Sequence, residues 1–428
     1  MPIGLTNNNP KIAIEIAIFD RKLKLYMRAP ALVPFILLSV ITIGNACQAQ
    51  KRSASKNPLL QTIQTDFEDG AKQYKVLKAL TPADSFPKTY YPKTGKSESS
   101  KSGWWCSGFY PGTLLYLYEQ THDTALYNEA VRKLSVLQKE QFNKGTHDLG
   151  FMMYCSFGNA NRIKPSAEYK EILLNSAKSL STRFNPTVGC IKSWDSKNPS
   201  DFLVIIDNMM NLELLFEETK ATGDSSYYKI AVTHANTTMN NHFRPDFSSY
   251  HVLNYDMNTG AVKEKKTAQG FANESAWARG QAWGLYGYTV CYRETKDVRY
   301  LQQAQHIAEF ILKHPNLPAD KIPYWDFNAP DIPNALRDAS AAAVMAAALI
   351  ELSQYTKSKD AKEYRDVAET IIKNLSAPGY KAAIGTNGGF ILQHGVGHKP
   401  ANSEEDVPLT YGDYYFIEAC KRYKELVK

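Results

Sequence analysis

The sequence predicts an all-α protein whose single domain is a closed double ring of about twelve helices in six hairpins. Two kinds of helix alternate along the chain, one apolar on a single face and one apolar on nearly every side. A helix enclosed by others is hydrophobic all round, whereas a surface helix is amphipathic. Strand-like alternation is scarce. The expected architecture is therefore an inner ring covered by an outer one, with a pocket at its centre.

The outer helices are predicted by a short sequence pattern that recurs along the chain. After an acidic or threonine-containing turn, a Tyr is followed by an Ala three or four positions later, in copies that begin at Tyr127, Tyr169, Tyr227, Tyr300 and Tyr364. Residues at this spacing share a helical face, and the small Ala lets a second helix come close. An Asp in the preceding turn suits a helix N-cap.

The inner helices are predicted where apolar and aromatic residues occupy several sides of a helical segment. Five segments have this composition, residues 108–119, 202–217, 276–292, 339–355 and 411–423. Each of these segments lies between two copies of the recurring Tyr–Ala pattern or next to one copy. Their ends at one side of the ring are expected to line the pocket.

Residues 1–47 are predicted to be a signal region for export. Met27 and Arg28 form a short basic start, and the apolar run that follows over residues 31–44 is too short to span a membrane. Translation starting at Met27 is one alternative, because the segment before it adds nothing to the signal. The protein is therefore expected to be exported from a bacterial cytoplasm, into the periplasm or onto a membrane.

The surroundings of Cys47 bear on whether the exported protein is lipidated or simply secreted. It follows the small residues Asn45 and Ala46, which resembles a lipoprotein cleavage site, but Gly44 stands where a larger aliphatic residue is usual. Membrane attachment through a lipidated Cys47 and simple secretion both stay open. Residues 48–57 are polar and are expected to be a tether, and residues 58–428 to be the catalytic domain.

Composition limits the kinds of partner. Lys and Arg total 50 against 43 for Asp and Glu, and this mild excess is spread along the chain. No basic block interleaved with aromatics indicates nucleic acid. The oligomeric state is not predicted. Five cysteines lie beyond Cys47, and their odd number and wide spacing predict neither disulfides nor a metal site, so they are expected to be small buried hydrophobes.

Two carboxylates stand out as candidates for chemistry. Asp207 interrupts an otherwise apolar run, and Asp148 follows His147 at the expected entrance of a helix. A buried charge is costly unless it is paired or used, although each Asp could also be a cap or a hydrogen-bonded core residue. If both faced one pocket, their repulsion would raise the pKa of one and keep it protonated near neutrality.

Residues 267–288 are the most unusual stretch of the chain. They combine Trp277, Arg279 and Trp283 with several glycines, although each glycine in a helix costs up to about 1 kcal/mol. Arginine among aromatics needs an anion, and a carboxylate is the natural one. Without a ligand, Arg279 is expected to pair with an acidic neighbour or water. His251 has no metal partner at a useful spacing and by itself indicates a structural role.

Several motifs together resemble the unsaturated glucuronyl hydrolases of glycoside hydrolase family 88. They occur in the family's order over residues 58–428, at 103–112, 147–151, 206–211, 267–270, 277–284, 324–327, 337–341 and 411–415. The family fold is an (α/α)6 barrel, in agreement with the double ring. One departure is Cys106, where the family often has a small polar residue, which leaves the pocket wall beside Trp105 undetermined.

The resemblance implies an unusual glycosidase with no cofactor and no metal. Asp207 would protonate C4 of a vinyl ether and then activate water for C5, with Asp148 as its essential partner. The residues implied to hold or wall the sugar are Trp105, His251, Thr267, Gln269, Trp277, Arg279 and Trp283. The usual retaining and inverting mechanisms, in which two carboxylates act at the anomeric carbon, would not apply in their usual form.

The implied substrate is a lyase-generated oligosaccharide ending in a 4,5-unsaturated uronic acid. A glycosaminoglycan fragment such as an unsaturated chondroitin, hyaluronan or heparin disaccharide is expected, with fragments of ulvan or pectin as the alternative. A different class of protein also stays open, a catalytically silent surface lipoprotein that binds glycans. The presence of both Asp148 and Asp207 argues against that class.

Overall fold

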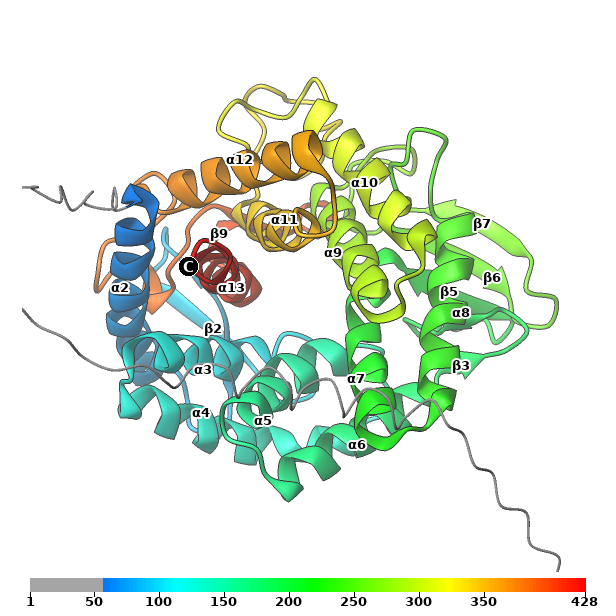
Figure 1. Ribbon diagram of the computed structural model, residues 1–428, viewed down its shortest axis with the longest axis horizontal. Coiled ribbons are helices and arrows are strands. Elements are labelled where there is room, and N and C mark those ends of the chain that lie inside the picture. The colour runs from blue at the N-terminus through cyan, green and yellow to red at the C-terminus, as the bar shows by residue number, and fades with distance from the viewer. Residues whose placement is uncertain (1–56) are drawn as a thin grey trace, which may run out of the picture. The chain divides into compact units, whose positions relative to one another are not determined.

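The computed structural model describes residues 57–428, in which six outer helices surround six inner helical segments (Figure 1). The outer helices are α2 (Pro58–Leu80), α4 (Thr124–Leu137), α6 (Ala167–Ser181), α8 (Ser225–Asn241), α10 (Val298–Lys313) and α12 (Ser358–Leu375). The inner segments are α3 (Phe109–Thr121), η2 (Gly150–Gly158) with α5 (Asn159–Ile163), η3 (Ile206–Asn211) with α7 (Leu212–Thr222), α9 (Ala278–Thr295), α11 (Ala339–Leu352) and α13 (Thr410–Leu426). The predicted double ring of about twelve helices in six hairpins is confirmed.

The short elements lie in the connections between these helices. Three 3-10 segments are η1 (Gln138–Phe142), η4 (Asn387–Gly389) and η5 (Lys399–Ala401). Antiparallel strands pair as β1 (Phe86–Tyr91) with β2 (Lys96–Ser100), β3 (Phe184–Asn185) with β4 (Cys190–Ile191), and β8 (Gly395–His398) with β9 (Ser403–Val407). A three-stranded sheet has the order β5 (Asp201–Ile205), β6 (Val252–Asp256) and β7 (Val262–Lys266). These sheets are more numerous than the sequence indicated.

The recurring Tyr–Ala pattern occurs in the outer helices, which confirms the prediction. Its tyrosines lie near the starts of α4, α6, α8, α10 and α12. The partner alanines of four copies are fully buried, namely Ala130, Ala231, Ala304 and Ala368. Asp123, Asp224 and Asp297 cap their helices by accepting the N–H two residues further on. The small alanines therefore bring the outer ring close to the inner one.

The prediction of one inner helix over residues 202–217 is wrong in its first half. The chain there forms β5, continues through the 3-10 turn η3, and becomes α-helical only from Leu212. Val204 and Ile205 are β-branched and pair with β6, which explains the extended conformation. An apolar run of this length does not distinguish a strand from a helix. As a result, Asp207 lies in a tight turn at the end of a strand.

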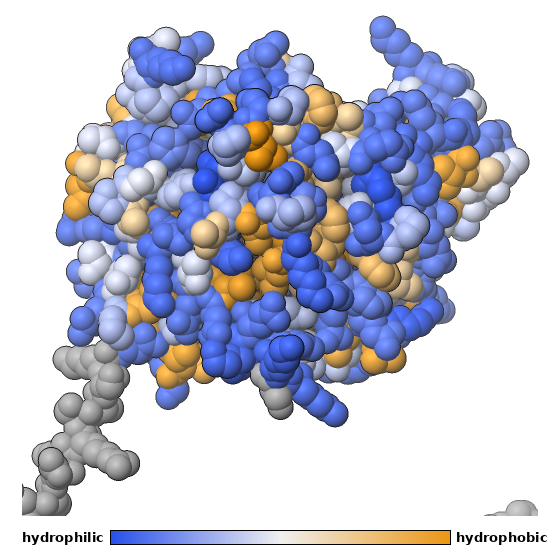
Figure 2. All heavy atoms as spheres, turned by 90° about the horizontal axis from the view of Figure 1, so that it is seen from above, coloured by the Kyte–Doolittle hydropathy of each residue, from blue (hydrophilic) through white to orange (hydrophobic). Residues whose placement is uncertain are grey.

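The described residues form one compact unit. Polar side chains cover most of the face shown in Figure 2, with hydrophobic residues in small groups. The five cysteines beyond Cys47 are buried and free, as predicted. Asn57, the last residue of the expected tether, caps α2 by accepting the N–H of Leu59 at 3.0 Å. The predicted signal region and the rest of the tether lie outside the described residues.

Within residues 57–428, no helix combines the length and the apolar character that crossing a bilayer requires. The helices of the inner ring are nevertheless strongly apolar, and α11 is buried along its whole length. Enclosure by the outer ring therefore accounts for their composition.

Close packing explains one glycine of α9. A Cβ added at Gly287 would lie 2.5 Å from the Cβ of Met209 and 3.2 Å from its carbonyl carbon, so this helix needs glycine to approach η3. At Gly284 the nearest atoms would be 3.6 Å away, which is ordinary van der Waals contact. Both glycines lie in the same helix, so only the contact differs between them.

We expect Gly287→Ala to destabilise the protein and Gly284→Ala to leave it unchanged or stabilise it by up to about 1 kcal/mol. Both changes gain the same helix propensity, but only the first forces an atom into η3, at a typical cost of about 1–3 kcal/mol for overpacking. Urea unfolding of the two variants measures the difference. Equal stabilities would show that α9 and η3 are not in close contact at Gly287.

Candidate active site

The predicted site residues gather at the N-terminal ends of the inner segments. Trp105 precedes α3, Asp148 precedes η2, Asp207 lies in the first turn of η3, and Arg279 lies in the first turn of α9. The first N–H groups of a helix lack intrahelical acceptors and carry a partial positive charge. This end of the barrel therefore favours an anionic ligand.

The Asp207 carboxyl is enclosed by the protein. The residue is 9% exposed, and its Oδ2 has no hydrogen-bond partner within residues 57–428. Burial raises the pKa of Asp207 to about 7; the positive charge of Arg279 opposes this rise, and the negative charge of Asp148 adds to it. The group is therefore an acid that still holds its proton near neutral pH.

His251 is held in one neutral form beside this acid. Its Nδ1 accepts the backbone N–H groups of Ala268 and Gln269, both at 3.1 Å, so that nitrogen carries no proton. Burial also lowers the pKa of His251 well below its usual range. The proton must then be on Nε2, which lies 3.7 Å from Oδ2 of Asp207. His251 thus presents an N–H donor beside Asp207 and is not available as a base.

Asp148 is positioned by its neighbours in sequence. Its Oδ2 accepts the Thr146 hydroxyl at 2.9 Å, and its own N–H donates to the same hydroxyl oxygen at 3.0 Å. Its Oδ1 lies 3.2 Å from Nε2 of His147, and the other ring nitrogen of this buried histidine contacts the carbonyl of Ser193 at 3.0 Å. The loop before η2 therefore fixes the Asp148 carboxyl from two sides.

Arg279 is buried and bound by protein groups. The residue is 1% exposed, and its Nη1 donates to Oδ2 of Asp338 at 2.8 Å. Nη1 and Nη2 also donate to the carbonyls of Val396 and Gly397 at 2.6 and 2.7 Å. The guanidinium stacks 4.6 Å from the ring of Trp277. An acidic neighbour therefore occupies the arginine of the ligand-free protein, as the sequence analysis expects.

The loop before α9 connects His251 with strand β8. Gln269 donates from its side chain to the carbonyl of Gly397 at 2.9 Å. The hydroxyl of Thr267 accepts the N–H of Gly270 at 2.8 Å, which shapes the turn. The ring of Trp277 lies 4.5 Å from that of His251. These three residues therefore build one wall around the histidine, with much of their hydrogen bonding directed into the protein.

The other two tryptophans occupy different depths. Trp105 is half-buried and packs 4.8 Å from the ring of Tyr411. Trp283 has no exposed surface, packs between Phe151 and Tyr415, and lies close enough to Asp207 to oppose the rise in its pKa. Cys106 is 2% exposed and points away from solvent, so the residue that departs from the family pattern does not line an open pocket.

Two further residues hold the site in place, and neither was predicted to have a role. Asp338 pairs with Arg279 and also caps α11 through Ser340. The carbonyl of Ser193 contacts the ring of His147. Asp338 lies in a motif that was recognised, and a buried acid beside a buried arginine is a usable signal. A backbone carbonyl gives no signal in the sequence, because every residue has one.

The geometry defines a class of protein. A ring of helices holds one carboxyl group near its neutral form beside a second carboxyl group, between aromatic walls and at helix N-termini. Paired acids of this kind beside aromatic rings are typical of glycoside hydrolases. Their placement on a helical double barrel narrows the class further.

Comparisons with known proteins agree with this class, although no protein-family model matches the chain. Over 403 residues the chain is 45% identical to the unsaturated glucuronyl hydrolase of Formosa agariphila, covering 92% of this chain and 99% of that protein. It is 33% identical over 325 residues to the unsaturated chondroitin disaccharide hydrolase of Streptococcus pneumoniae, covering 74% and 81%. A crystal structure of an unsaturated glucuronyl hydrolase specific for heparin matches with a TM-score of 0.83 and 47% identity, over 86% of this chain and 98% of that one. The chain belongs to the unsaturated glucuronyl hydrolases, glycoside hydrolase family 88.

We expect Arg279→Lys to lower both stability and kcat/KM. Lysine has a single side-chain nitrogen and cannot place donors where both Nη1 and Nη2 of Arg279 meet Asp338 and the two carbonyls, a loss of about 1.5–3 kcal/mol in hydrogen bonding to charged groups. If the same planar group also orients a substrate carboxylate, kcat/KM falls by about tenfold or more. Melting temperature and kcat/KM of the folded variant measure the two effects separately.

Arg132→Lys is the matched control for Arg279. Arg132 also donates three hydrogen bonds, to Glu129 and to the carbonyl of Ala83, but it lies on outer helix α4. That variant should lose stability alone. Unchanged kcat/KM in a well-folded Arg279→Lys enzyme would restrict Arg279 to a structural role.

Proposed function

We propose that this enzyme removes the terminal 4,5-unsaturated uronic acid from glycosaminoglycan-type oligosaccharides produced by lyases. The single observation that supports it best is the enclosed Asp207, whose raised pKa keeps a proton available beside an anion-favouring helix end. An unsaturated uronic acid offers the complementary chemistry, because its vinyl ether accepts a proton at carbon and its carboxylate is an anion. The relatives named above carry substrates of this kind in their names.

The proposed reaction begins with proton transfer from Asp207 to C4 of the double bond. Positive charge then develops at C5, where a water molecule adds, and the same carboxylate accepts the proton that this water releases. The hemiketal that results opens and frees the next sugar. Enclosure of Asp207 prepares the first step, because burial disfavours the carboxylate and so keeps the proton on the carboxyl group near neutral pH until the substrate is bound.

The surrounding residues are proposed to bind and orient the sugar. His251 donates from Nε2 and, being neutral, leaves the proton chemistry to Asp207. Asp148, fixed by Thr146, accepts hydrogen bonds from sugar hydroxyls and raises the pKa of Asp207 through its negative charge. Trp105 and Trp277 supply flat apolar surfaces for the ring faces. Asp338, Val396 and Gly397 use three of the five N–H groups of Arg279, and on this proposal the remaining two attract the substrate carboxylate.

The parent polysaccharide is the open part of the proposal. Digests of chondroitin, hyaluronan, heparin and ulvan by their lyases all carry the unsaturated terminal sugar. Loss of the ultraviolet absorbance of its conjugated alkene reports hydrolysis directly. Turnover of ulvan or pectin fragments alone would replace the glycosaminoglycan assignment, and binding of every digest without turnover would indicate a silent glycan-binding protein.

We expect Asp207→Asn to lower kcat by orders of magnitude while the substrate still binds, because an amide cannot supply the proton. Asp148→Asn should also be nearly inactive. In the wild-type enzyme, kcat/KM should fall as pH rises through about 7, where Asp207 loses its proton. Near-normal turnover by Asp207→Asn would remove this residue from the acid role.

Asp413 provides the control for burial without catalysis. Burial also raises its pKa to about 7, but its carboxylate accepts the N–H groups of Ile391 and Leu392 and the hydroxyl of Tyr74. Because folding raises both pKa values, stability falls as pH rises from about 4 to about 7. Asp413→Asn should alter the pH dependence of stability. The fall of kcat/KM as pH rises through about 7 should stay as in the wild-type enzyme.

We also propose that the protein is exported, with or without a lipid on Cys47. The basic start at Met27 and the apolar run after it support this. Protein recovered from the native host should begin at or close to Cys47, and N-terminal sequencing with mass spectrometry would detect both the cleavage and an acyl group. A chain that keeps residues upstream of Met27 in the cytoplasmic fraction would contradict export.

A further inference from the structure

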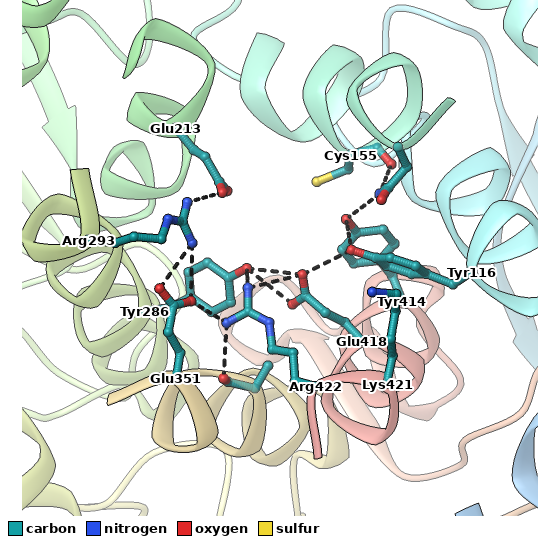
Figure 3. A network of polar contacts seen from close by, with 12 residues as sticks. Tyr116, Cys155, Glu213, Tyr286, Arg293, Glu351, Tyr414, Glu418, Lys421 and Arg422 are labelled. Carbon is teal, nitrogen blue, oxygen red and sulfur yellow. Dashed lines mark hydrogen bonds and ion pairs between the residues drawn. The ribbon is translucent and has the colours of Figure 1, made fainter. Parts of the chain in front are cut away.

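A second cavity, of about 650 Å³, lies at the opposite end of the barrel from Asp207. Its walls include Tyr116 of α3, Tyr286 of α9, Glu351 of α11 and Glu418 of α13, all two or more turns beyond the starts of their helices (Figure 3). The catalytic candidates lie at the starts of the same inner segments. The cavity has the size of a binding site for a small organic molecule.

The arginines of this cavity are already paired with carboxylates. Arg293 donates to both oxygens of Glu351 at 3.0 and 3.2 Å and also to Glu213. Arg422 donates to Glu351 at 2.5 Å and to Glu418 at 3.2 Å (Figure 3). An anionic ligand would have to displace one of these carboxylates, at the expense of a buried ion pair. The pairing therefore leaves neither guanidinium free for an acidic sugar. Lys170, on the exposed rim of the cavity, has no ion-pair partner within residues 57–428.

Other polar groups of the cavity have no protein partner. Glu218 is 4% exposed and lines the cavity, yet its carboxyl makes no hydrogen bond or ion pair within residues 57–428. Burial, together with the charge of Glu217, raises the pKa of Glu218 to about 7. The hydroxyl of Tyr154, also on the wall, likewise has no partner in the described residues. A carboxyl group that holds its proton donates as well as accepts hydrogen bonds, and so does a phenol.

These groups fit hydroxyls better than they fit ions. A metal ion is disfavoured, because the described residues contain no group of three His, Cys, Asp or Glu side chains arranged to hold one. The ring of Tyr154 supplies a flat surface, and paired carboxylates keep lone pairs free for further donors. We propose that this cavity binds a neutral saccharide of one or two sugar units.

An aromatic layer separates the two ends of the barrel. The ring of Trp283 lies 5.2 Å from that of Phe151 and 5.4 Å from that of Tyr415, and Tyr415 lines the second cavity. Trp283 has no exposed surface. The aromatic layer therefore separates most of the second cavity from Asp207. Gly150 and Met210, which lie within three residues of the two candidate acids, also line this cavity.

Titration calorimetry with N-acetylglucosamine and with cellobiose tests the proposal. Both are saturated and uncharged, so neither carries the features that the candidate active site recognises. We expect one bound molecule per chain, with a Kd of about 1 mM or tighter, measured with sugar at about 10 mM. Absence of binding at that concentration, or binding of putrescine in place of both sugars, would overturn the proposal.

Four variants locate the bound sugar. Ala221→Trp fills the exposed rim of the cavity, and Glu218→Leu removes the unpaired carboxyl at similar volume. Each should weaken saccharide binding by about tenfold or more, the size of a hydrogen bond to a charged or ionisable group. Glu168→Gln removes an exposed carboxylate outside the cavity, and Asp207→Asn alters the other end, so both should bind as the wild type does.

The melting temperature separates loss of binding from loss of folding. Glu218→Leu replaces a buried acid that has no partner, so this variant should melt at the same temperature as the wild type or higher. Binding that survives in both Ala221→Trp and Glu218→Leu but disappears in Asp207→Asn would place the sugar at the active site and refute the second site.

Discussion

The buried ion pair between Arg279 and Asp338 holds the candidate active site together. These residues are 1% and 0% exposed and tie the starts of α9 and α11 to the carbonyls of Val396 and Gly397 in β8. A lone buried charge of either sign would be expensive, so each residue makes the other tolerable. The same guanidinium opposes the rise in the pKa of Asp207. Burial prevails, and the acid stays near its neutral form at physiological pH.

The two ends of the barrel stabilise polar groups in different ways. At the helix starts, a few groups such as Asp207 and His251 keep part of their hydrogen-bonding capacity free, and the helix dipoles favour an anion. At the helix ends, Arg293 lies in the last turn of α9 and Arg422 just before the last turn of α13, where cations complement the negative pole. There the charges neutralise one another. One ring of helices can thus present an anion-favouring site and a charge-neutral cavity.

Local spacing was enough to predict the outer ring, because Tyr and Ala three or four residues apart face the same neighbour. Motif recognition singled out Asp148, Asp207 and Arg279 as candidates for the active site. It was not enough for residues 202–217, because β-branched apolar residues suit a buried strand as well as a buried helix until a pairing partner is known. Strand β6, about fifty residues away along the chain, provides that partner.

By itself, the sequence determined the all-α double ring and the identities of the acids, since helix periodicity and residue chemistry are local properties. Only the tertiary structure decided which groups titrate near neutral pH and which side chains are fixed by hydrogen bonds to other parts of the chain. The pKa of Asp207 depends on enclosure by distant segments, the tautomer of His251 on two amides of another loop, and the state of Arg279 on Asp338. Desolvation and hydrogen bonding act through space, and the segments that provide them are not adjacent in the chain.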